Sequence, residues 1–235
     1  MHTRSNNMII KTSKHSIDWS IVSDDVKTAL IKVSGGLDSA IVLYMLCRYI
    51  TTSNKDISIV VLTTNDWLKP YQITWSTKVL DWIKREFPTV KFIAHETAQL
   101  KHGEDYVVGQ AKHLELVKSN YAKQGITFDI KFSGVNQAPP VDVFEVEEFS
   151  GKLPPGPPED RRSIRPTKAG TWFWPIQNFD KKDIAELYQQ FDLTDTLFYQ
   201  TRSCEESVLE RTNNLTTHCG SCWWCQERKW GFGKL

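Results

Sequence analysis

The stretch that most constrains the fold of this 235-residue chain is KVSGGLDSAIVLYML, which runs from Lys32 to Leu46. The apolar run at 29–33 ends at two glycines, and a second apolar run follows with the spacing of a helix. This order predicts a buried strand that turns sharply into a helix. Such a turn lets the backbone approach a ligand closely and points the helix N-terminus, with its amide groups, at an anion.

Alternating strand and helix patterns fill the first 136 residues. We expect strands at 29–33, 56–64, 90–96 and 128–135, and helices at 37–50, 71–87 and 105–125. Repeated β-α units predict an α/β fold in which helices cover both faces of a parallel sheet. Sheets of this kind bind ligands at the carboxyl ends of their strands.

The pattern breaks between residues 137 and 170, a stretch that holds most of the chain's prolines and runs from an acidic half to a basic half. Two interpretations stay open: a solvated surface insertion and a lid that closes over the active site with its basic side chains. We therefore expect one compact domain with a nucleotide-binding core at 1–136, an insertion or lid at 137–170 and a C-terminal helical segment at 171–235. Asp180 is expected to cap a helix at 180–191 in that last segment.

Composition places few limits on function. The formal net charge of +1 gives no global reason to expect a nucleic-acid or membrane partner. No apolar run approaches the roughly 18 residues that a bilayer span requires, and the N-terminus lacks the apolar core of a secretory signal. We expect a cytoplasmic protein that needs no membrane and no direct nucleic-acid contact.

Four of the five cysteines lie near the C-terminus in the spacing C-x14-C-x2-C-x2-C: Cys204, Cys219, Cys222 and Cys225. Cysteines this close can place their thiolates on one tetrahedral ion, and four thiolates make a closed structural zinc site. An iron–sulfur cluster uses the same ligands and stays open as the alternative, as do free thiols. The fifth, Cys47, stands alone in an apolar helical pattern and is expected to be a small buried hydrophobe.

Two serines flank the glycine pair and complete a cradle for phosphate. Ser34 and Ser39 contribute hydroxyl donors at the two ends of the turn. No lysine stands where the Walker-A pattern requires one, and the dinucleotide fingerprint does not fit. Asp38 can only accept hydrogen bonds, so beside a polyphosphate we expect it to act through Mg²⁺ or by orienting the loop.

The segment SGGLDS resembles the PP-loop of the ATP pyrophosphatases, whose fold is similar to that of the adenine-nucleotide α-hydrolases. The resemblance implies that the loop holds pyrophosphate while a substrate oxygen attacks the α-phosphorus of ATP, and it makes Ser34, Asp38 and Ser39 the catalytic candidates. The end of the second strand, 63–65, lies where such folds hold adenine or ribose, although ordinary strand-end polarity explains it equally well. The candidate nucleotide-binding residues are Ser34, Gly35, Gly36, Leu37, Asp38, Ser39, Thr63, Asn65 and Gly134.

The chain as a whole resembles the 7-cyano-7-deazaguanine synthase family, through the PP-loop, IKFSGVN, WPIQNFDKKDIAELYQQFDL and the C-terminal SC…CGSCWWCQER. The resemblance implies that 7-carboxy-7-deazaguanine is adenylated with ATP and converted by ammonia, through an amide, to the nitrile, in queuosine or deazaguanine modification. It also implies a homodimer. The expected cofactors are ATP, Mg²⁺ and Zn²⁺. The family's Pro-Gly-Arg-Asn and Tyr-Pro-Asp-Cys-Arg segments, which are expected to help recognise the substrate, are replaced here by VVGQAKH and NQAPP.

Other functions stay open at this point. The chain could activate a different acid, or it could modify a tRNA base in the manner of a thiolase or lysidine synthetase. Such a tRNA enzyme needs a basic face, and only 161–168 is notably basic. A non-catalytic interaction module would be favoured by exposed aromatic side chains, and Trp223, Trp224 and Trp230 could form such a patch or pack around the metal.

Overall fold

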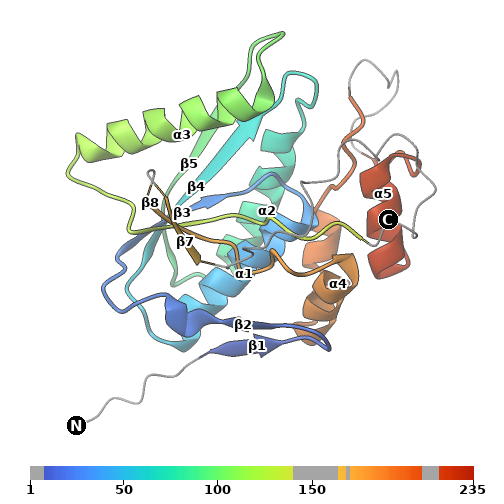
Figure 1. Cartoon of the computed structure of the whole chain (residues 1–235), viewed down its shortest axis with the longest axis horizontal. Helices are drawn as coiled ribbons and strands as arrows, with labels where there is room; N and C mark the ends of the chain where they lie inside the picture. The colour runs from blue at the N-terminus through green and yellow to red at the C-terminus, as the bar shows by residue number, and fades with distance from the viewer. Residues whose placement is uncertain (1–7, 140–163, 168–169, 208–216) are drawn as a thin grey trace.

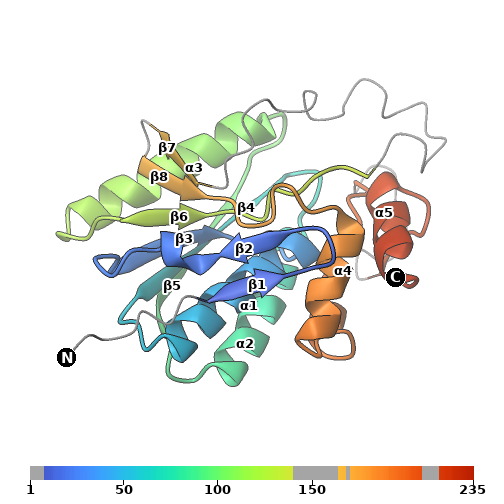
Figure 2. The same ribbon diagram turned by 60° about the horizontal axis from the view of Figure 1, so that its bottom comes forward.

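The structure is a computed structural model, and it describes residues 8–139, 164–167, 170–207 and 217–235. Figure 1 shows a central sheet with helices on both faces. Figure 2 shows the same molecule turned so that the N-terminal hairpin comes forward. None of the helices in the described ranges combines the length and the apolar composition that a bilayer crossing requires.

The central sheet has six strands in the order β5-β4-β3-β6-β8-β7. All neighbouring strands run parallel except β7 and β8. The chain passes from β3 to β4 and β5 on one side and then returns to place β6 and β8 on the other, so the order reverses between β3 and β6. The bounds are β3 (Thr28–Lys32), β4 (Ser58–Asn65), β5 (Lys91–Gln99), β6 (Ile130–Phe132), β7 (Ile164–Thr167) and β8 (Gly170–Phe173).

Helices cover both faces of this sheet, as the sequence predicted. Figure 1 shows α3 along one face and α1, α2 and α4 along the other, with α5 beside α4. The expected α/β fold with a parallel sheet is therefore confirmed. The helices are α1 (Leu37–Thr52), α2 (Gln72–Glu86), α3 (Tyr106–Ala122), α4 (Lys181–Gln190) and α5 (Trp223–Phe232), with two short 3-10 turns, η1 (Trp19–Ile21) and η4 (Leu197–Gln200).

The core divides between the two faces. The larger apolar cluster lies under α1, α2 and α4, and the smaller one, which includes Leu30, Leu62 and Val117, lies under α3. Strand β4 is buried along almost its whole length, which explains why its sequence reads as a continuous apolar run. The lone Cys47 is fully buried in α1, and burial raises the pKa of its thiol, so it is the inert core residue expected.

An N-terminal hairpin is the first feature that the sequence did not predict. Strands β1 (Ile9–Lys11) and β2 (Ser16–Asp18) pair antiparallel, and each is too short to show a periodic pattern. The hairpin delivers Trp19 to the core, where its ring stacks 5.4 Å from that of Tyr49 and 6.0 Å from that of Phe132. The fully buried indole fixes this segment to the sheet.

The stretch expected to be an insertion or lid lies partly outside the described residues. Residues 140–163 and 168–169, which carry most of the lid prediction, are among those not described. The hairpin of β7 and β8 extends the sheet, and β8 supplies its fifth parallel strand next to β6. Regular structure therefore begins before residue 171, the expected start of the C-terminal segment.

Candidate functional site

The glycine loop, residues 34–39, joins the end of β3 to the start of α1 at the carboxyl edge of the sheet. Gly36 is the N-cap of α1 and offers no side-chain cap, so the first amide groups of this 16-residue helix have no internal acceptor. Such amide groups can bind an anion, and the phosphate site at this turn stays a prediction. Leu37 belongs to the loop only through its backbone, because its side chain is fully buried in the core.

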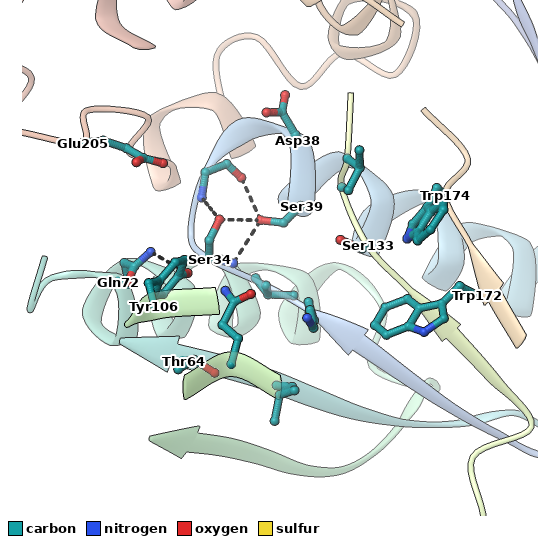
Figure 3. Close-up of a pocket in the computed structure, with 17 residues that line it drawn as sticks. Ser34, Asp38, Ser39, Thr64, Gln72, Tyr106, Ser133, Trp172, Trp174 and Glu205 are labelled. Carbon is teal, nitrogen blue, oxygen red and sulfur yellow. Dashed lines mark hydrogen bonds between the residues drawn. The ribbon is translucent and has the colours of Figure 1, made fainter. Parts of the chain in front are cut away.

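The two serine hydroxyls hold the loop together (Figure 3). The Ser39 Oγ accepts a hydrogen bond from the Ser34 N–H at 3.2 Å and donates to the Gly36 carbonyl at 3.2 Å. The Ser34 Oγ lies 3.3 Å from the Ser39 Oγ and accepts from the Gly36 N–H at 3.4 Å. Both hydroxyls thus bond within the loop, and both serines line the pocket in front of it.

Two glycines are required by close backbone contacts. Gly35 has a φ of +84°, and a Cβ there would lie 2.6 Å from the Cβ of Trp75 in α2. Gly134, just after β6, would place a Cβ 2.6 Å from the amide nitrogen of Ser39. The first turn of α1 is therefore held between the end of β6 and α2, which fixes the position of the predicted phosphate site.

Asp38 points away from the serines and forms an ion pair that the sequence did not predict. Both of its oxygens accept hydrogen bonds from the Lys181 ammonium, at 2.6 and 2.7 Å. The same ammonium lies 3.3 Å from a carboxylate oxygen of Glu227 in α5. The turn that lacks its own lysine thus receives one from the first residue of α4.

Burial and charge compete at this triad of Asp38, Lys181 and Glu227. Burial alone would lower the pKa of Lys181, but Asp38 and Glu227 raise it above its ordinary value, so the amine stays protonated. Burial raises the pKa of Glu227, and the Lys181 ammonium opposes that rise.

A first cavity of about 410 Å³ opens between the glycine loop and α3. The loop forms one wall and the indoles of Trp172 and Trp174 form another (Figure 3). The Gln72 amide donates to the Tyr106 hydroxyl at 3.2 Å on the far side. Among the sequence-predicted residues, those that line this cavity are Ser34, Gly36, Asp38, Ser39 and Gly134.

At the end of β4, successive side chains point to opposite faces of the sheet, and this decides which of them reach the first cavity. The Thr63 hydroxyl donates to the Val33 carbonyl at 2.6 Å, and the Asn65 amide donates to Gln99 at 2.5 Å. Both side chains are buried on the face away from the first cavity. Thr64, between them, lines the cavity and bonds to His113 at 2.9 Å. The structure therefore brings Thr64 to the glycine loop and leaves Thr63 and Asn65 within the fold.

Lys32 is a further cavity residue that sequence reasoning passed over. It is the last residue of β3, lines the first cavity, and holds its ammonium 5.3 Å from the centre of the Trp172 ring. Burial lowers the pKa of its amine, and no carboxylate of the described ranges forms an ion pair with it. A lysine at the end of an otherwise apolar strand was the available signal.

A second cavity of about 350 Å³ lies on the other side of the glycine loop, toward α5. Its walls come from the start of α2, the segment after η4 and the start of α5. It shares five residues with the first cavity, so the two spaces meet at the loop: Ser34, Gly36, Asp38, Gln72 and Glu205.

The four predicted metal cysteines come together beside the second cavity. Cys204 follows η4, Cys222 caps α5, and Cys225 lies in its first turn. All four sulfurs lie within 4.8 Å of one another, with the Sγ atoms of Cys219 and Cys225 3.8 Å apart. The Cys222 N–H donates to the Cys219 sulfur at 3.2 Å, as in other sites where a turn amide supports a thiolate ligand.

This cysteine cluster fits a single tetrahedral ion. Metal–sulfur bonds of about 2.3 Å in a tetrahedron place the sulfurs roughly 3.8 Å apart, close to the observed spacing. A four-iron cluster must fit four irons and four sulfides between its thiolates and needs wider separation. Without a cation, hydrogen bonds from Cys222 and Cys225 lower the pKa of the Cys204 thiol. The same interactions with Cys204 raise the pKa of Cys222 to about 11 and that of Cys225 far above its usual value.

The cluster and the glycine loop are joined directly. The Arg202 N–H donates to the Gly35 carbonyl at 2.9 Å, two residues before Cys204. The Tyr71 hydroxyl donates to the Cys204 carbonyl at 3.0 Å. Together with the contact of Lys181 to Glu227, these bonds attach the metal-binding segment to the turn that begins α1.

Comparisons with known proteins give distant likenesses to solved structures. No family model matches the chain, and no curated protein matches it. The U34-tRNA thiolase NcsA from Methanococcus maripaludis, solved with its [4Fe-4S] cluster, aligns with a TM-score of 0.43 at 12% identity over 71% of this chain and 58% of the thiolase. NAD⁺ synthetase from Burkholderia pseudomallei aligns with a TM-score of 0.41 at 14% identity over 89% of this chain and 75% of the synthetase. At these TM-scores neither likeness carries an argument about the reaction.

Proposed function

We propose that this protein is an ATP-dependent enzyme that activates a carboxylic acid as an acyl-adenylate at the glycine loop. The observation that carries the proposal is the meeting of two cavities at that loop. Adenylation brings the α-phosphate of ATP and the oxygen of a second substrate to one point. A phosphate cradle shared by two separate chambers provides such a point.

The first cavity suits the nucleoside half of ATP. It lies at the carboxyl edge of the sheet beside the point where the strand order reverses, the position at which open α/β sheets bind nucleotides. Its indole wall offers a stacking surface for adenine, and the hydroxyl of Thr64 is available to the ribose. In this proposal Thr64 takes the role expected of Thr63 and Asn65.

The triad suits the charge that develops when pyrophosphate leaves. Lys181 supplies the cation that the loop sequence lacks, and Asp38 and Glu227 hold it beside the uncapped start of α1. A fixed cation in a buried site stabilises developing negative charge without reorganisation. Mg²⁺ at the phosphates would have to share the carboxylate of Asp38 with Lys181, so Asp38 acts first by orienting the lysine.

The acceptor is proposed from the family resemblance. In that reaction a carboxylate oxygen of 7-carboxy-7-deazaguanine attacks the α-phosphorus and pyrophosphate leaves. Ammonia then attacks the acyl carbon and AMP leaves, which gives the amide on the way to the nitrile. The walls of the second cavity include Tyr71, Trp223 and Trp224, which suit a planar bicyclic acid.

Zinc is proposed for the cysteine cluster. Four thiolates at the spacing of one tetrahedral ion leave no open position for water, so the ion would have a structural role. It would hold Cys204 next to Arg202 and α5 next to Lys181, and thereby keep the second cavity in shape.

The reaction is tested by product analysis. Purified protein is incubated with ATP, Mg²⁺, 7-carboxy-7-deazaguanine and an ammonium salt, and nucleotides are separated by chromatography. We expect AMP and pyrophosphate, with the nitrile, only when the acid is present. ADP and phosphate as products would contradict adenylation, and AMP formed only when tRNA replaces the acid would favour a tRNA-modifying enzyme.

A further inference from the structure

We propose that the second cavity is the acceptor site and that Arg202 binds the carboxylate of a planar aromatic acid there. The inference rests on the proposed function and deepens it, because it names the group that recognises the acid. It also gives a role to a residue that the sequence reading did not use.

Arg202 is held rigidly at the cavity wall. Its guanidinium lies 3.6 Å from the centre of the Tyr71 ring, its Nη1 donates to the Cys204 carbonyl at 2.7 Å, and its Nε donates to the Thr217 carbonyl at 3.3 Å. The residue is 4% exposed, and its Nη2 has no hydrogen-bond partner among the described residues. The positive charge is thus fixed in place by neutral groups, with the Nη2 amino group left over.

The charges around the cavity single out this arginine. Of the residues that the structure describes, three with cationic side chains line the space: Lys69, Lys181 and Arg202. Lys69 pairs with Glu205, and Lys181 pairs with Asp38 and Glu227. In the described part of the chain no carboxylate forms an ion pair with Arg202. A buried guanidinium is costly without an opposite charge, and an acid that enters the cavity would supply one.

The aromatic walls define the rest of the ligand. The rings of Tyr71, Trp223 and Trp224 line the same cavity, and the guanidinium stacked on Tyr71 lies at the edge of this surface. A planar bicyclic acid could lie against the rings while its carboxylate meets the Arg202 fork, which matches carboxylate geometry. The backbone bond from Arg202 to Gly35 keeps that fork close to the glycine loop, where the carboxylate must react.

The test compares acids with their neutral amides in metal-loaded protein without ATP. Binding of 7-carboxy-7-deazaguanine and of its carboxamide is measured by titration calorimetry, together with indole-3-carboxylate and indole-3-carboxamide as probes that do not depend on the proposed reaction. The variants are Arg202→Gln and Arg202→Lys. The matched control is Arg228→Lys. Arg228 is also a buried arginine whose guanidinium lies 3.9 Å from the centre of an aromatic ring, that of Phe198, but Arg228 lines neither cavity.

We expect Arg202→Gln to weaken binding of both acids at least about 10-fold, the loss of one charge-assisted contact, and to leave the amides unchanged. The acid affinity of Arg202→Lys should lie between those of the parent and Arg202→Gln, and the acid affinity of Arg228→Lys should equal that of the parent. Metal content and circular dichroism are measured on each variant, and Arg202→Lys decides the matter if Arg202→Gln does not fold.

Three results would overturn the assignment: acid affinity unchanged in the Arg202 variants, equal losses for acid and amide, or no acid binding to the parent protein. The outcomes separate this inference from the proposed function. AMP formation with normal acid affinity in Arg202→Gln rejects the carboxylate site alone. Acid binding that depends on Arg202, without AMP formation from ATP, rejects adenylation alone.

Discussion

Both carboxylate oxygens of Asp38 accept hydrogen bonds from the ammonium of Lys181, although 143 residues separate the two in the chain. Lys181 is 2% exposed and Asp38 is partly exposed, and both residues line the second cavity. The contact ties the glycine loop to α4, and through Glu227 it ties both to the helix that carries Cys225.

The first prediction concerns this ammonium. Lys181→Met should lower ATP turnover at least about 100-fold, since a fixed cation at a developing charge contributes on that scale. It should also lower the free energy of unfolding by roughly 3 kcal/mol, because Asp38 and Glu227 lose their shared partner. Steady-state kinetics and urea unfolding measure the two effects.

The neighbouring Lys182 is the matched control, because it is exposed to solvent. Lys182→Met should change neither turnover nor stability measurably. If Lys181→Met turned over ATP like the control, the ammonium would have no part in the reaction.

A second prediction concerns the packing of the loop. Gly134→Ala should lower the free energy of unfolding by roughly 2 kcal/mol, as overpacking does, because the new methyl group meets the backbone of Asp38 and Ser39. Gly36→Ala is the control, since its nearest contact would be 3.5 Å from the Ser34 Oγ at an ordinary φ. Equal stability of the two variants would mean that the end of β6 does not hold the start of α1.

A third prediction concerns pH. Burial lowers the pKa of His113 and of His95 below the usual 6.5, so the fold holds both rings neutral. In the unfolded chain these two rings take up protons as the pH falls through about 6.5, whereas in the folded protein they do so only at lower pH. Stability from these rings is therefore present above about pH 6.5 and is lost as the pH falls through the folded pKa.

His113→Gln should remove part of that pH dependence, and its amide can still bond to Thr64. Urea unfolding at intervals from pH 7.5 to 5.5 measures the slope, with the exposed His102→Gln as control. If the free energy of unfolding of His113→Gln changed with pH as steeply as that of the parent, the His113 ring would not contribute to the pH dependence.

A fourth prediction concerns the metal. Purified protein should contain about one zinc per chain, and removal of the metal by a chelator should lower Tm because structural-site binding energy is folding energy. Cys222→Ser should lower both metal content and Tm, whereas Cys47→Ala should keep the metal. Iron with a brown colour and absorption near 400 nm would instead identify an iron–sulfur cluster.

Much of the α/β core could be predicted from sequence because its signals are local. Continuous apolar runs marked the strands before and after α1, and helical spacing marked α1 to α4. Asp180 caps α4 through a capping box with Asp183, as its place before the helix predicted. The spacing of the four cysteines likewise predicted their convergence, because a tight turn brings closely spaced thiols together.

The remaining features depend on contacts between distant segments. Strands of three or four residues, such as β1 and β7, give too little alternation to stand out from a loop. The pairing of Lys181 with Asp38 and the bond from Arg202 to Gly35 arise only when α4 and the segment after η4 pack on the loop. Sequence patterns report which residues are buried, and they do not report which buried charges meet.

The most direct test of the account follows oxygen from acid to nucleotide. The acid, 7-carboxy-7-deazaguanine labelled with ¹⁸O in its carboxylate, is incubated with the protein, unlabelled ATP, Mg²⁺ and ammonia, and the AMP is analysed by mass spectrometry. If a carboxylate oxygen attacks the α-phosphorus at the glycine loop, each AMP released in the first step carries one ¹⁸O. AMP without label, or ADP in its place, would contradict acyl-adenylate formation by this protein.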